Sequence, residues 1–62
     1  MLTPPSRLPR LLDLPDAAKA LRVSVKTVRR WIEQRELRVH RLGRQLRISE
    51  EDLAAFVNRS RA

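Results

Sequence analysis

The spacing of the apolar residues changes at Leu37, and this change limits the folds open to the chain. Before Leu37 the apolar residues recur at helical intervals, and after it they alternate with polar residues as they do in strands. The chain has 62 residues, a size at which a single domain buries only about 60% of the surface of its unfolded chain. The sequence therefore predicts one small domain in which helices precede a β-hairpin.

The first half of the chain carries two helix-start signals, at Asp13 and at Ser24. Asp13 is a good N-cap with a proline in the following turn, and it predicts a helix over residues 14–21. Ser24 caps a predicted second helix over residues 25–36. The apolar face of the second helix is expected to comprise Val28, Trp31, Ile32 and the stem of Arg35. Its opposite face is polar and mostly basic, with Lys26, Thr27, Arg29, Arg30 and Glu33.

After Leu37 the alternation predicts two strands, over residues 39–42 and 45–48. Gly43 and Arg44 form the turn between them, and a glycine in the first position favours a type II′ hairpin. One face of the second strand is expected to carry Leu46 and Ile48, and the other Gln45 and Arg47. A last helix then begins after Ser49, with acids in its first turn and an apolar stripe of Leu53, Phe56 and Val57.

Together these elements predict an α+β, mostly helical fold, the winged helix-turn-helix. It consists of two helices joined by a tight turn, a two-stranded β-hairpin wing and a C-terminal helix. The folded domain is expected over residues 11–58. Residues 1–10, which contain three prolines, are interpreted as a flexible basic arm, and residues 59–62 as a short basic tail.

Positive charge is concentrated between Lys19 and Arg47, where ten basic residues stand against only two acids, Glu33 and Glu36. This segment alone has a charge of about +8 (ten minus two), in a chain whose net charge is +7. A field of this density attracts polyanions, of which nucleic acid is the commonest in a cell. Most other acids lie at the starts of the two outer helices, where we expect them to stay away from bound phosphates.

Composition argues against several other functions. There is no cysteine and only one histidine, so neither a disulfide nor a zinc site is expected. No segment approaches the roughly 20 apolar residues of a membrane span, and no signal peptide is recognisable. With Gly43 as the only glycine, no phosphate-binding glycine-rich loop exists. The chain is expected to be a soluble cytoplasmic protein that needs no cofactor and is not an enzyme.

Several motifs match a known pattern, beginning with Asp13-Leu14-Pro15-Asp16-Ala17-Ala18-Lys19-Ala20-Leu21-Arg22-Val23-Ser24 and Thr27-Val28-Arg29-Arg30-Trp31-Ile32. The pattern continues through Glu36-Leu37, Arg41-Leu42-Gly43-Arg44, Arg47-Ile48 and Glu51-Asp52-Leu53. Over roughly residues 11–57 the chain thereby resembles the small excisionase-type DNA-binding domains related to the MerR helix-turn-helix. The chain departs from this pattern at two places. Arg22 stands in the turn between the helices, where members commonly have glycine. Arg35 or Gln34 stands near the end of the second helix, where glycine is also common.

The resemblance implies an excisionase, or recombination directionality factor, of a bacteriophage or other mobile element. Such a protein binds tandem sites on double-stranded DNA, bends the DNA and promotes excision by a site-specific integrase in the bacterial cytoplasm. MerR-type regulators continue into a dimerisation helix, whereas this sequence ends soon after its last predicted helix. We therefore expect a monomer in solution that assembles head to tail on DNA. Two alternatives remain: a small MerR- or AlpA-like transcriptional regulator, and an interaction module whose basic face meets an acidic protein.

The predicted DNA contacts lie on two elements. From the second helix, expected to enter the major groove, they are Ser24, Lys26, Thr27, Arg29 and Arg30. From the wing, expected to follow the minor groove, they are Arg41, Gly43, Arg44, Gln45 and Arg47. The alternative for both sets is a solvated charged surface. Trp31 and Phe56 fall on apolar stripes, so they are predicted to pack in the core rather than stack on single-stranded nucleic acid.

Overall fold

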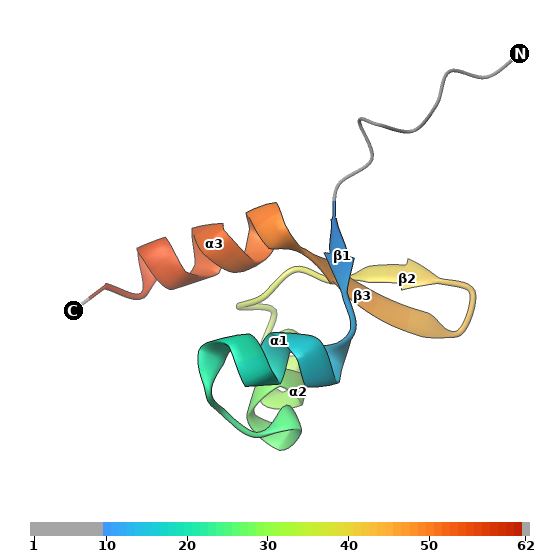
Figure 1. Cartoon of the computed structure of the whole chain (residues 1–62), viewed down its shortest axis with the longest axis horizontal. Coiled ribbons are helices and arrows are strands. Elements are labelled where there is room, and N and C mark those ends of the chain that lie inside the picture. The colour runs from blue at the N-terminus through green and yellow to red at the C-terminus, as the bar shows by residue number, and fades with distance from the viewer. Residues whose placement is uncertain (1–9, 62) are drawn as a thin grey trace, which may run out of the picture.

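The computed structural model describes residues 10–61 (Figure 1). Its elements are, in order, β1 (Leu11–Leu12), α1 (Leu14–Leu21), α2 (Val25–Glu33), β2 (His40–Leu42), β3 (Gln45–Ser49) and α3 (Glu50–Arg59). The predicted α+β winged helix-turn-helix is confirmed. Residues 1–9 of the predicted arm and residue 62 of the predicted tail lie outside the described residues.

All three helices begin at the predicted caps. In each case the side chain of the capping residue accepts a hydrogen bond from the backbone N–H three residues later, which satisfies an amide that the helix leaves free. The pairs are Asp13 with Asp16 (2.8 Å), Ser24 with Thr27 (3.1 Å) and Ser49 with Asp52 (3.0 Å). These short-range bonds start each helix independently of the rest of the fold.

The end of α2 differs from the prediction. The helix stops at Glu33 rather than at residue 36, because Arg35 adopts a left-handed backbone conformation with φ 62°. The amides of Glu36 and Leu37 turn back to the carbonyl of Trp31, at 2.9 and 3.3 Å. The side chain of Arg35 is therefore exposed, and its predicted place on the apolar face is wrong. Leu37, just beyond this turn, is buried instead.

A third strand, which the sequence did not predict, joins the wing. The two residues of β1 pair antiparallel with β3, Leu11 opposite Ser49 and Leu12 opposite Ile48, in a sheet of order β1-β3-β2. The amide of Glu50 extends this pairing by donating to the carbonyl of Arg10 at 2.9 Å. The predicted two-stranded wing is thus the outer part of a three-stranded sheet.

The hairpin turn has the predicted form. Leu42 pairs with Gln45, which leaves Gly43 and Arg44 as the two loop residues. Gly43 has φ +64°, whereas Arg44 is not among the residues with positive φ. A positive φ confined to the first loop residue is what a type II′ turn requires.

The core lies between the helices and β3, with Val28 and Ile48 fully buried at its centre. Phe56 is buried and Trp31 is partly buried, and their ring centroids are 4.8 Å apart, so both pack in the core as predicted. The predicted burial of Val57 is wrong, since its side chain is 44% exposed. It lines an open hollow between α1 and α3 together with Leu21.

The helices and the wing occupy different sides of the molecule. In Figure 1 the β2–β3 hairpin extends to one side of the sheet junction and α3 to the other, with α1 and α2 packed together beside them. Among the described residues no helix is long and apolar enough to cross a membrane.

Candidate nucleic-acid interface

One side of α2 is fixed in the interior and the other is left to solvent. Val28 is fully buried, whereas Lys26, Arg29 and Arg30 are exposed. At the start of the helix the Oγ of Ser24 lies 3.0 Å from the Oγ1 of Thr27, in addition to accepting the Thr27 amide. The predicted recognition residues thus line the accessible side of α2, except that Thr27 is partly buried.

The strand register decides where the wing residues stand. Arg41 pairs with Leu46, and His40 pairs with Arg47. Because directly opposed residues share a face of the sheet, Arg41 lies on the face of Leu46, and Arg47 on the opposite face. Arg47 is partly buried, and its Nη1 donates to the carbonyl of Leu46 at 2.8 Å, which holds its guanidinium close to the strand.

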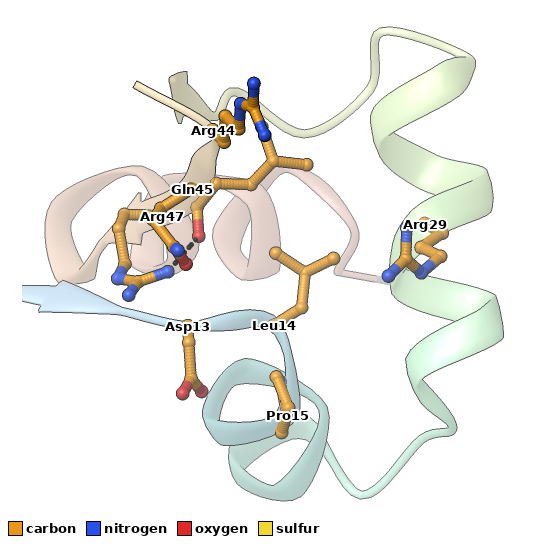
Figure 2. Close-up of a pocket in the computed structure, with 8 residues that line it drawn as sticks. Asp13, Leu14, Pro15, Arg29, Arg44, Gln45 and Arg47 are labelled. Carbon is orange, nitrogen blue, oxygen red and sulfur yellow. Dashed lines mark hydrogen bonds between the residues drawn. The ribbon is translucent and has the colours of Figure 1, made fainter. Parts of the chain in front are cut away.

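A hollow of about 370 Å³ separates α2 from the wing (Figure 2). Figure 2 shows Arg29 of α2 on one side and Arg44 and Arg47 of the wing on the other, with Leu14 and Pro15 between them. The residues that line it are Asp13, Leu14, Pro15, Arg29, Arg44, Gln45, Leu46 and Arg47. We call this surface the arginine groove. Of the predicted contacts it brings together Arg29, Arg44, Gln45 and Arg47, but not Ser24, Lys26, Thr27, Arg30, Arg41 or Gly43.

The positive charge of the arginine groove is not neutralised by ion pairs. Over residues 10–61 the salt bridges join Arg10 to Glu50 (3.9 Å) and His40 to Asp52 (3.6 Å), the latter only when the histidine is protonated. Neither involves an arginine of the groove. Three guanidiniums without ion-pair partners around one open hollow supply the charge and the donors that bind phosphate, because arginine forks match phosphate oxygens.

One acid lies in this groove, contrary to the prediction that the acids of the outer helices stay away from it. Asp13 lines the hollow at the start of α1. The pairing of β1 with β3 is responsible, since it carries the start of α1 alongside the wing. In Figure 2 the Asp13 carboxylate points away from Arg47, and its Oδ1 accepts the amide of Asp16. No sequence pattern indicated this placement, because β1 itself was not predicted.

The described residues show no cluster of three or more histidines, cysteines or acids that would hold a metal ion.

The sequence also matches a known protein family. Residues 11–61 match a family model described as a helix-turn-helix domain. The chain belongs to this helix-turn-helix family. It is a family of small DNA-binding domains found in excisionase-like proteins, and its members are typically not enzymes. No curated protein and no solved structure matches the chain significantly. The predicted binding of double-stranded DNA is thereby supported at the level of the family, with α1 and α2 as the two helices of the helix-turn-helix.

Proposed function

We propose that this helix-turn-helix protein is an excisionase, a recombination directionality factor of a bacteriophage or other mobile element. It binds tandem sites on double-stranded DNA, bends the DNA and promotes excision by a site-specific integrase in the bacterial cytoplasm. The family supports this role because its domain is found in excisionase-like proteins. The observation that carries the proposal is the arginine groove, in which a helix and a wing present unpaired cations around one hollow.

In the proposed complex the exposed side of α2 enters the major groove, which at about 12 Å is wide enough to admit a helix. An arginine on this side can bond the O6 and N7 of guanine together. The α2 contacts are Ser24, Lys26, Thr27, Arg29 and Arg30. The wing follows the adjacent backbone and minor groove through Arg41, Gly43, Arg44, Gln45 and Arg47, where a narrow minor groove attracts arginine.

The small size of the binding surface favours binding by several copies that shape the DNA together over binding by a single copy. A single module of this kind buries about 600–1,000 Å² on DNA, which limits the affinity of one copy. Copies on adjacent sites add their contacts, and we propose that the protein, a monomer in solution, assembles head to tail on the DNA. Smooth bending of a short site costs roughly 1–6 kcal/mol, which repeated phosphate contacts offset.

The test is a gel-shift and footprinting experiment on an attachment-site fragment, with and without a site-specific integrase. Tandem protected repeats, an induced bend and stimulated excision are the expected results. A single palindromic footprint beside a promoter would instead indicate the transcriptional regulator. Failure to bind any duplex, together with tight binding to an acidic protein, would contradict DNA binding itself.

A further inference from the structure

A second arginine-lined hollow lies at the opposite end of α2 from its Ser24 cap. Its volume is about 490 Å³ and it is formed where the end of α2 meets the end of α3. The lining residues are Arg35, Glu36, Arg38, Phe56, Arg59 and Ser60. None of them lines the arginine groove. The helix has nine residues and is therefore about 14 Å long, so the hollow stands well beyond the capped start of α2.

Arg59 is held in position at this hollow. Its Nη2 donates to the carbonyl of Glu36 at 2.8 Å, and its guanidinium carbon lies 6.0 Å from the centroid of the Phe56 ring. A guanidinium fixed by a hydrogen bond and an aromatic face loses less freedom when it binds an oxyanion. Arg59 is thus preorganised, with the remaining donors of its fork available to a ligand.

Arg35 occupies a backbone conformation that would suit glycine better. Its φ of 62° places it in the left-handed region, which strains any residue with a Cβ. Its exposed side chain makes no hydrogen bond or ion pair within residues 10–61, and the same holds for Arg38. The guanidiniums of Arg35 and Arg38 are therefore available to a ligand of the hollow that they line with Arg59.

The lining favours phosphate over a protein partner. Protein interfaces are organised around exposed aromatic or aliphatic anchors that become buried on binding. Here the only apolar side chain is Phe56, which is already buried in the core. The other lining residues are polar or charged, and Glu36 is the single acid among three arginines. Arginine forks on a polar rim suit phosphate oxygens.

We propose that Arg35, Arg38 and Arg59 form a second phosphate-binding surface for the DNA that flanks the segment held by the arginine groove. This inference rests on the proposed function. In this arrangement a duplex that touches both the groove and the hollow follows a curved path past α2. The second surface therefore contributes to bending by holding phosphates on the inner side of the curve.

The experiment compares two duplexes, one limited to the footprint of a single copy and one extended by about one helical turn, roughly 10 bp, on each side. We expect Arg35→Gly to melt at a higher temperature, because glycine relieves the left-handed strain. On the extended duplex the same variant should bind about tenfold more weakly in low salt, with a salt slope lower by about 1. On the short duplex its affinity should equal that of the unmodified protein. Arg38→Gln should reproduce the binding loss without the gain in melting temperature.

Arg22→Gly is the matched control, since Arg22 is the other left-handed arginine and lies outside the hollow. It removes the same charge and relieves the same strain, and we expect it to change the affinity for the two duplexes by the same factor.

Three results would overturn the second surface. One is unchanged binding of Arg35→Gly and Arg38→Gln to both duplexes, and another is an equal loss on both, which indicates bulk charge alone. The third is normal binding and bending with loss of integrase stimulation, which assigns the hollow to an acidic partner protein. Failure of DNA binding itself is distinguishable, because the unmodified protein would then not bind even the short duplex. Failure of the excisionase role alone would show in the footprint and excision assays, with binding to both duplexes kept.

Discussion

The interior and the arginine groove share two elements, α2 and β3. Each of these elements contributes residues to both regions. In α2 the fully buried Val28 is followed directly by Arg29, which lines the groove. In β3 the fully buried Ile48 is preceded directly by Arg47, which also lines the groove. Because neighbouring residues serve the two regions, the packing of the interior sets the positions of the groove arginines.

The two regions differ in how their side chains are satisfied. Over the described residues, no buried side-chain nitrogen or oxygen lacks a hydrogen-bond partner, so the interior is complete by itself. The groove arginines, by contrast, have no ion-pair partners in the same range. Substitutions in the interior are therefore expected to change stability, and substitutions in the groove to change binding with stability kept.

Trp31→Ala should give the largest effect and should act on the interior. The ring packs 4.8 Å from that of Phe56, and truncation of a core tryptophan costs about 3–5 kcal/mol. Because Trp31 is only partly buried, we expect a loss near 3 kcal/mol in the free energy of unfolding, measured by urea denaturation. Trp31→Phe, which keeps an aromatic pair, should lose much less. A Trp31→Ala protein that unfolds normally but binds DNA poorly would place the tryptophan in the interface instead.

Arg44→Ala should act on the groove alone. If Arg44 contacts one phosphate, its removal lowers the slope of log affinity against log salt by about 1, and it weakens binding in low salt by about tenfold. The urea midpoint should stay unchanged, since the side chain is exposed at the hairpin tip. Lys19→Ala removes one charge from an exposed position on α1 and serves as the control. Identical salt slopes for the two variants would mean that the wing does not touch DNA.

Arg22→Gly should stabilise the protein slightly. Arg22 ends α1 with φ 59° and ψ 43°, a left-handed conformation that costs a residue with a Cβ about 1–2 kcal/mol. Glycine removes this strain but adds about 0.5–1 kcal/mol of unfolded-chain entropy, so the net gain should be between about 0 and 1.5 kcal/mol. Arg22→Ala, which loses the charge and keeps the strain, should show no gain in the urea midpoint. A gain with alanine as large as with glycine would attribute the effect to charge.

The helix starts and the hairpin turn could be predicted because their causes are local. The caps at Asp13, Ser24 and Ser49 each bond an amide three residues away. The turn needs a positive φ only at Gly43, and glycine accepts it at little cost. Sequence patterns of a few residues contain all of this information.

The features that were missed depend on distant residues or on costly conformations. The strand β1 has two residues and exists because Leu11 meets Ser49, far along the chain. The end of α2 depends on Arg35 accepting a strained φ, which residue preferences disfavour. The arginines of the groove were identified from charge and motif. The position of Asp13 in the groove was not predicted, because it depends on the unpredicted strand β1.

Asp13→Asn tests the groove with the smallest change. Asparagine caps a helix as well as aspartate does, so the fold and the Asp16 amide bond should be kept. The variant loses the one negative charge among Arg29, Arg44 and Arg47. Interactions of surface charges are worth about 0.2–1 kcal/mol, so binding to any duplex should tighten by roughly 1.4- to 5-fold in low salt. Asp16→Asn makes the same charge change at an exposed position outside the groove. Fluorescence anisotropy measures the DNA affinity of both variants. If DNA lies along the groove, Asp13→Asn raises the affinity more than Asp16→Asn does. Equal increases would mean that DNA does not bind at this groove.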